Sequence, residues 1–158
     1  MIDSKELHPT TREALHAAGW SPERRVATHR WHTLLTGDGY IWSDIIQKFL
    51  TNLGGLSILP ARSQEAVFGS STLETDPSLV IGEYERIRER EKIIGEALCP
   101  IGEWGGESIL LLAPSGRVYS ETTYHVLLLG QTPTEALDVI VRAHRYPELV
   151  QGSVWWNK

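Results

Sequence analysis

The order of two hydrophobic periodicities constrains this chain more than any other feature of its sequence. Apolar residues recur at helical spacing over about residues 10–18, 28–36 and 42–53. Short apolar runs of the kind found in strands dominate residues 97–130, and a final helical pattern begins at Thr132. Helices, then strands, then a closing helix predict an α+β fold, in which helices flank an antiparallel sheet of about four to six strands.

The third predicted helix, about Trp42 to Leu53, is expected at the centre of the core because its apolar stripe is broad. The stripe consists of Ile41, Ile45, Phe49 and Leu53, with Trp42, Ile46 and Leu50 beside them. Two glycines follow, and a strand is predicted from Leu56 to Leu59. We expect Gly54 to end the helix at positive φ, which residues with a β-carbon avoid, and Gly55 to let the chain turn towards the strand.

Capping signals mark the first and the last helix. Thr10 and Glu13 have the spacing of a capping box at the start of the first helix. In the last helix Thr132 is the predicted N-cap, Pro133 occupies the first helical position, and Glu135 completes a second capping box.

A charged amphipathic helix is predicted from about Leu79 to Ile94. Its apolar face is thin, so most of this helix is expected to be solvated. Glu83 and Arg86 form an opposite-charge pair at i,i+3 spacing, whereas Arg86 and Arg90 form a like-charge pair at i,i+4. The helix is therefore expected to depend on tertiary contacts for its stability.

The sheet is predicted mainly from the last third of the chain. Residues 97–103 indicate a short strand or an edge segment, because Pro100 favours an edge position. Residues 108–113 and 117–122 form a predicted hairpin, and the apolar run at residues 125–130 indicates a strand buried on both faces. Earlier in the chain, a strand-like alternation passes through Val67, Phe68 and Leu73.

Length and composition indicate one soluble domain over residues 1–158, with a core from about 15 to 145 and a short tail from 146 to 158. No apolar run approaches the ~20 residues of a membrane-spanning helix, and the first ten residues do not resemble a signal peptide. With one cysteine no internal disulfide forms, so a cytoplasmic protein is expected. The net charge of −5 argues against binding nucleic acid by neutralising phosphates.

No motif carries a convincing catalytic or metal-binding pattern. Cys99 lies among apolar residues, where a buried inert thiol is expected. His29 and His32 have helical i,i+3 spacing, but no third metal ligand belongs to a recognisable motif. The glycine-rich stretch at residues 102–106 has no lysine and no helix after it, so it is not a phosphate loop. We therefore expect no enzymatic activity, no metal and no cofactor.

One tryptophan lies in a polar loop, unlike those in or beside the predicted helices. Trp104 lies between Glu103 and Glu107 in the sequence GEWGGE. A tryptophan with an acidic rim can anchor a protein partner, or it can fold back over the sheet, and the sequence fits both interpretations equally. The Trp155-Trp156 pair near the C-terminus either packs against the body of the protein or trails from it.

An ordered series of short motifs resembles a known family. The series is AAGWSPERRV (residues 17–26), the tryptophan of HRWHTLL, FLTNLGGLSI, TDPSL, LCPIGE (residues 98–103), SGRVY and LLLGQTPTEALDVIV. It spans about residues 15–145 and is similar to the SUKH superfamily, specifically to its third subfamily of bacterial immunity proteins. The chain departs from that pattern at Leu53, where many relatives have phenylalanine, and in the longer tail after Arg145.

The resemblance implies a SUKH-like (Smi/Knr-like) α+β fold and an immunity protein that binds and neutralises a polymorphic toxin domain, often a nuclease or deaminase, by occlusion. An acidic face that meets a basic toxin would speed association. The candidate contacts are Glu103, Trp104 and Glu107, with Glu83, Glu85 and Glu89 of the charged helix as a second surface. The alternative is an interaction or regulatory adaptor of the same fold with no toxin partner. Direct binding to nucleic acid or membrane is not expected.

Overall fold

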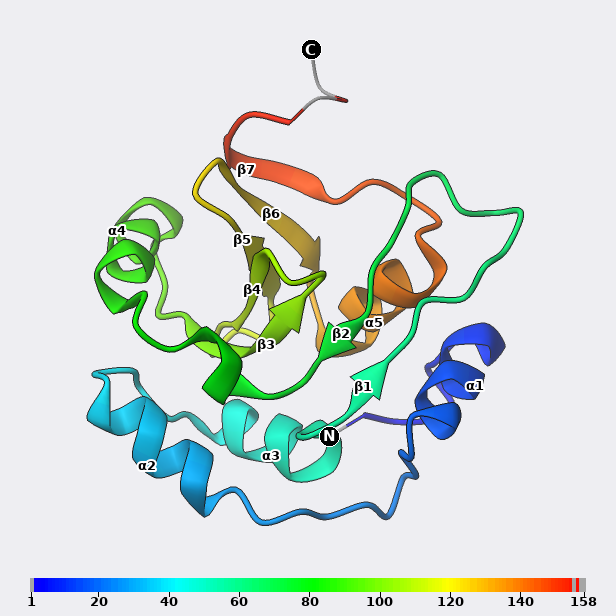
Figure 1. Cartoon of the computed structure of the whole chain (residues 1–158), viewed down its shortest axis with the longest axis horizontal. Helices are drawn as coiled ribbons and strands as arrows, with labels where there is room; N and C mark the ends of the chain where they lie inside the picture. Colours follow the sequence, from blue (N-terminus) through cyan, green and yellow to red (C-terminus); the bar gives the residue numbers. More distant parts are fainter. Residues whose placement is uncertain (1, 155, 157–158) are drawn as a thin grey trace.

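The sheet is an antiparallel meander that runs in chain order from β1 to β7 in the computed structural model, which describes residues 2–154 and 156 (Figure 1). The strands are β1 (Ser57–Ile58), β2 (Leu73–Glu74), β3 (Cys99–Trp104), β4 (Ser108–Leu112), β5 (Val118–Glu121), β6 (His125–Gly130) and β7 (Glu148–Gly152). The helices are α1 (Pro9–Ala17), α2 (His29–Gly37), α3 (Asp44–Leu53), the 3₁₀ helix η1 (Pro77–Val80), α4 (Tyr84–Ile94) and α5 (Pro133–Arg142). The predicted α+β fold is confirmed, although the described residues form seven strands instead of four to six.

Helices surround the sheet. In Figure 1, α1, α3 and α2 lie in a row along the lower edge of the view, and α4 lies at the left. α5 packs against β6 and α1, while η1 packs against β3 and α2. The central position predicted for α3 is confirmed, since four residues of its apolar stripe are buried: Ile46, Phe49, Leu50 and Leu53. Ile41 is an exception and is 66% exposed, because the helix begins only at Asp44.

The junction between α3 and β1 differs from the prediction at one of its two glycines. Gly54 has a φ of −64°, so the predicted positive φ is wrong, and the turn is made by Gly55 with a φ of +79°. A β-carbon at Gly54 would lie 2.5 Å from the Leu50 carbonyl oxygen and 2.5 Å from the Trp31 ring. Gly54 is therefore required by the close approach of a ring on α2, which no local pattern reports.

The first helix begins earlier than its capping pattern predicts. His8 is the N-cap of α1, and its Nδ1 accepts a hydrogen bond from the Thr10 backbone N–H at 3.1 Å. Pro9 occupies the first helical position, so the cap lies before it and the predicted Thr10–Glu13 box does not form.

The charged helix begins later than predicted. Residues 77–80 form η1, and Gly82 then takes a φ of +93°, which separates η1 from α4. The helix therefore begins at Tyr84 and not at Leu79. The alternation at Val67 and Phe68 is also not a strand, because both residues lie in the loop between β1 and β2.

Two further details of the sheet concern its edges. Pro100 pairs with Leu111 of β4, but β2 pairs with β3 only at Glu103 and Trp104, so the edge position predicted for Pro100 holds on that side. β7 lies within the segment expected to be a short tail, and it pairs with β6 from Leu128 to His125. The last strand therefore brings the C-terminal segment back over the sheet.

Candidate functional site

The three candidate residues around Trp104 do not form one patch. Trp104 is the last residue of β3, and Glu103 is the residue before it, so the two side chains point to opposite faces of the sheet. Glu107 lies on the exposed β3–β4 turn, where Gly105 and Gly106 both have positive φ. The structure therefore brings Trp104 and Glu107 to one surface and separates them from Glu103.

The Trp104 ring folds back against the loop before β2. Its Nε1 donates a hydrogen bond to the Ser71 carbonyl oxygen at 3.0 Å, and its ring meets Phe68 edge to face at 6.2 Å. The ring remains half-buried, so one part of it packs and another part stays at the surface. Part of the ring therefore packs against the β1–β2 loop, and its role as an anchor for a partner stays a prediction.

Trp104 belongs to a continuous row of aromatic rings. Phe68 stacks on Tyr146 at 5.8 Å, and Tyr146 stacks on Trp156 at 5.0 Å. Trp155 lies outside the described residues. The row borders a cavity of about 300 Å³, which we call the aromatic hollow; among its lining residues are Phe68, Trp104, Glu107, Ser120, His125 and Trp156. Residues from five separate segments thus meet at one surface, and no local pattern predicts their meeting.

The acidic candidates of α4 lie on a helix that is fixed to the sheet by buried charge. Glu121 of β5 is fully buried and accepts hydrogen bonds from Arg86 Nε at 2.8 Å and from Arg90 Nε at 3.1 Å. The hydrogen bond between Arg86 and Glu121 is the main cause that raises the pKa of Arg86. Arg86 and Arg90, the like-charge pair noted in the sequence, therefore both bind the same carboxylate, that of Glu121.

The three candidate acids, Glu83 at the N-cap of α4 and Glu85 and Glu89 within it, differ in their partners. Glu83 forms the predicted i,i+3 pair with Arg86 at 2.9 Å, and Glu89 forms the predicted pair with Lys92 at 3.0 Å. Glu85 is exposed. Glu121 was not among the candidate residues, yet an acid on β5 opposite two arginines on one helix face was a signal that could have found it.

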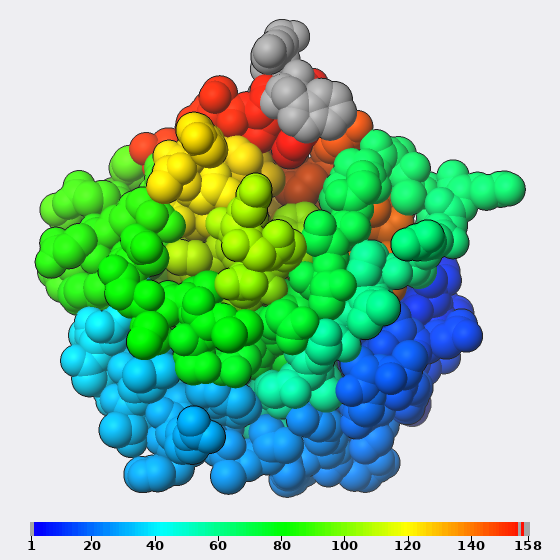
Figure 2. Space-filling model, viewed as in Figure 1, coloured from blue at the N-terminus to red at the C-terminus, as the bar shows by residue number. Residues whose placement is uncertain are grey.

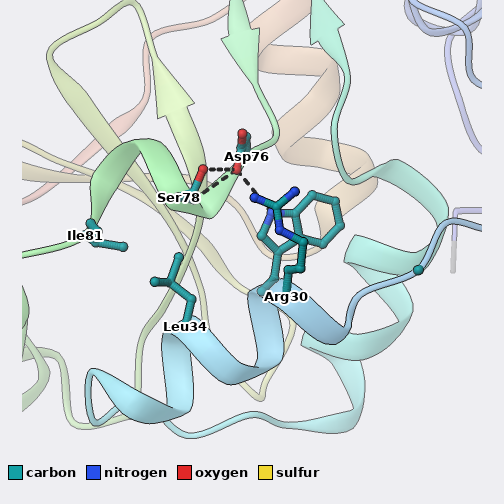
Figure 3. Close-up of a pocket in the computed structure, with 7 residues that line it drawn as sticks. Arg30, Leu34, Asp76, Ser78 and Ile81 are labelled. Carbon is teal, nitrogen blue, oxygen red and sulfur yellow. Dashed lines mark hydrogen bonds between the residues drawn. The ribbon is translucent and has the colours of Figure 1, made fainter.

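A second groove lies between α2 and η1 and has a volume of about 350 Å³ (Figure 3). Arg30 and Leu34 of α2 approach it from one side, and Asp76, Ser78 and Ile81 approach it from the other. Asp76 Oδ1 accepts hydrogen bonds from the Ser78 backbone at 3.0 Å and from the Trp31 indole at 3.1 Å. Burial alone would raise the pKa of Asp76, but the hydrogen bonds from Ser78 and Trp31 and the charge of Arg30 outweigh it, and the pKa lies below its ordinary value.

The family model of SUKH-3 immunity proteins matches residues 7–143 of the chain. The chain belongs to the SUKH-3 immunity protein family. The resemblance inferred from the motif series is therefore confirmed. Comparisons with curated proteins and with solved structures give no match. The match ends at the C-cap of α5, so β7, Tyr146 and Trp156 lie beyond the part of the chain matched to SUKH-3.

The groups of this SUKH-3 protein that sequence analysis tested for chemistry lie in ordinary surroundings. Burial, with a smaller contribution from Glu91, raises the pKa of the Cys99 thiol to about 12, so the thiol is protonated at neutral pH. His29 and His32 are exposed on α2. Within residues 2–154 and 156, no three His, Cys, Asp or Glu side chains are placed to hold a metal ion. The described helices are all too short or too polar to cross a membrane.

Proposed function

We propose that this SUKH-3 protein binds a cognate toxin domain and neutralises it by covering the toxin's active site. The observation that carries the proposal is the family match over residues 7–143. The net charge of −5 favours a basic partner, such as a nuclease or a deaminase that acts on nucleic acid in a bacterial cytoplasm. Occlusion requires no turnover, which is consistent with the protonated, buried Cys99.

The surface proposed for the toxin includes the β3–β4 turn and α4. In Figure 2 the turn is yellow-green near the centre and α4 is green at the left, so both lie on the face shown. A standard interface covers about 800 Å² of each partner, which is enough for one domain to contact both elements. Trp104 is expected to contribute affinity, and the acids Glu103, Glu107 and Glu85 are expected to steer association.

The proposal is tested with the toxin domain encoded beside this protein. The two chains are co-expressed and purified, and the activity of the toxin is measured as the SUKH-3 protein is added. We expect a stable complex and loss of toxin activity. A toxin that stays fully active at saturating protein would contradict the proposal, and would favour the adaptor role considered from the sequence.

Association kinetics then locate the surface. Trp104→Ala should speed dissociation by roughly tenfold or more, because buried aromatic anchors carry most interface energy. Glu103→Gln with Glu107→Gln should slow association and weaken its dependence on salt. Glu6→Gln with Glu13→Gln, an equal change of two charges at exposed positions in and just before α1, is the matched control. If only changes at Glu83, Glu85 and Glu89 alter the kinetics, the toxin docks on α4 alone.

A further inference from the structure

The aromatic hollow opens at the surface where three distant segments meet. One wall is formed by Trp104 at the end of β3, a second by Phe68 in the β1–β2 loop, and a third by Trp156 after β7. In Figure 2 the red C-terminal segment, the yellow-green β3–β4 turn and the blue-green β1–β2 loop converge on this region. Its volume of about 300 Å³ is at the lower end of the range for ligand sites, and suits one side chain better than a cofactor.

The walls of the hollow favour a cation. The faces of aromatic rings carry negative electrostatic potential, and three such rings line the space. Glu107 adds a carboxylate at the rim, and it has no ion-pair partner among the described residues. The described lining contains no lysine or arginine that would neutralise this potential.

A buried hydroxyl in the hollow has no hydrogen-bond partner. Ser120 of β5 is 0% exposed, and its Oγ is unpaired among the described residues. Burying an unpaired hydroxyl costs free energy, so such a group in a cavity wall is expected to meet a donor from a ligand. His125 also lines the hollow, where its Nδ1 lies 3.2 Å from the Ser153 carbonyl oxygen, which can only accept a hydrogen bond.

We propose that the aromatic hollow binds an arginine side chain of the protein partner. The planar guanidinium stacks on the rings, pairs with Glu107 and donates hydrogen bonds to Ser120 Oγ. An arginine satisfies all three features at once, since it combines a flat cationic surface with several N–H donors. The inference rests on the proposed function, because it specifies the chemistry by which the basic toxin is recognised.

The first test uses the isolated protein and needs no toxin. The peptide acetyl-Gly-Arg-Gly-amide is titrated into ¹⁵N-labelled protein, and the Trp104 indole, Glu107 and Ser120 resonances are followed by NMR. A matched peptide carries citrulline, which keeps the shape of arginine and removes its charge. We expect saturable shifts with the arginine peptide and about fivefold weaker binding of the citrulline peptide, as a cation–π contact implies. Equal binding of the two peptides, or no shift at these three residues, overturns the inference.

The second test uses the complex with the cognate toxin. Glu107→Gln should raise the dissociation constant about tenfold, as expected for loss of a charged pair that is partly shielded from water. Ser120→Ala should raise the dissociation constant roughly threefold without lowering thermal stability, because the hydroxyl it removes is unpaired in the free protein. Glu13→Gln on α1 is the matched control and should bind as the unmodified protein does.

The outcomes separate this inference from the proposed function. If the complex forms but Glu107→Gln and Ser120→Ala bind as tightly as the control, the hollow is not the contact, the inference is overturned, and the proposed function stands. If no complex forms, the proposed function fails, and the peptide titration alone decides whether the hollow recognises a guanidinium. Replacing arginines of the toxin one at a time should identify one whose loss abolishes the effect of Glu107→Gln.

Discussion

α5 and α4 are helices of 10 and 11 residues that are held in place by different forces. α5 buries five apolar residues, Ala136, Leu137, Val139, Ile140 and Val141. In α4 only Ile87 is fully buried, and polar contacts, chief among them Arg86 and Arg90 bound to Glu121, supply much of its attachment. Apolar burial is spread over many atoms, whereas α4 relies more on charged contacts, two of which meet at the Glu121 carboxylate.

The difference teaches where each helix is vulnerable. Apolar contacts have little directional preference, so a change in one α5 side chain removes only a fraction of the free energy that apolar burial gives this helix. A buried ion pair has already lost the hydration of its charges, and it stabilises the fold only while every partner is present. We therefore expect α4 to depend on one distant residue, and α5 to depend on close packing and on its cap.

The largest effect is expected from Glu121→Ala, which should break the attachment of α4. Removal of one partner of a buried ion pair costs about 3–5 kcal/mol, and we expect the lower end because Arg86 is 30% exposed and can reach water. The measurement is chemical denaturation monitored by tryptophan fluorescence, with hydrogen exchange of the α4 amides. α5 should keep its protection.

A triple variant serves as the control for the charge cluster. Glu121→Leu with Arg86→Met and Arg90→Met removes all three charges together, and such apolar replacements are often neutral. Recovery of stability in the triple variant would show that the unpaired charge causes the loss. An equal loss in both variants would mean that α4 is held by packing, as α5 is.

The next effect tests close packing beneath α5. A β-carbon at Gly130 would lie 2.6 Å from the Ala136 backbone nitrogen and 2.7 Å from Glu135 Cβ. Gly130→Ala should therefore cost about 1–3 kcal/mol by overpacking the contact between β6 and α5. Thermal melts measure the loss, and Gly69→Ala, at a loop position with open space around it, is the matched control. A Gly130→Ala melt that overlays the control would refute close contact at this point.

A smaller effect is expected at the cap of α5. Thr132 Oγ1 accepts a hydrogen bond from the Glu135 backbone N–H at 3.2 Å, whereas α4 has no side-chain cap. Thr132→Ala should cost about 1 kcal/mol, and Thr132→Ser should restore most of it. Calorimetry checks both variants. If Ser behaves as Ala does, the hydroxyl is not what stabilises the helix start.

The smallest effect concerns acid at the segment that leads into α4. The pKa of Asp76 is lowered in the folded state, so its stabilising contribution is present above the unfolded pKa near about 4 and is lost as pH falls through the folded pKa. The protection of the Ser78 amide should fall over this acidic range, and Asp76→Asn should flatten the dependence. Hydrogen exchange as a function of pH makes the measurement. An unchanged pH dependence in Asp76→Asn would assign the acid sensitivity to another carboxylate.

The elements that the sequence predicted well have their signals within a few residues. Thr132, Pro133 and the apolar positions that follow them placed the start and buried face of α5. The apolar stripe of α3 did the same for the core helix. β7 escaped prediction because its exposure alternates without an apolar run, and it becomes a strand by pairing with β6.

The sequence identified some residues of the candidate site but not how they are arranged in space. Trp104 and Glu107 were chosen from an aromatic flanked by acids, and both line the aromatic hollow. Glu103 points to the other face because it is one residue from Trp104 on β3, a strand that continues one residue beyond the predicted segment 97–103. Ser120 and Trp156 could not be chosen, since neither belongs to a motif and both reach the hollow through the pairing of β5, β6 and β7.

By itself the sequence determined the α+β class, the family and the helices whose caps and apolar stripes are local. Those features depend on interactions within one or two helical turns, so a short stretch of sequence is enough to predict them. The tertiary structure alone decided that Arg86 and Arg90 share Glu121, that Gly54 meets the Trp31 ring, and that five segments enclose the aromatic hollow. Arg86 and Glu121 are 35 positions apart, and contacts at such separations are set by sheet register and helix packing, which no short stretch of sequence contains.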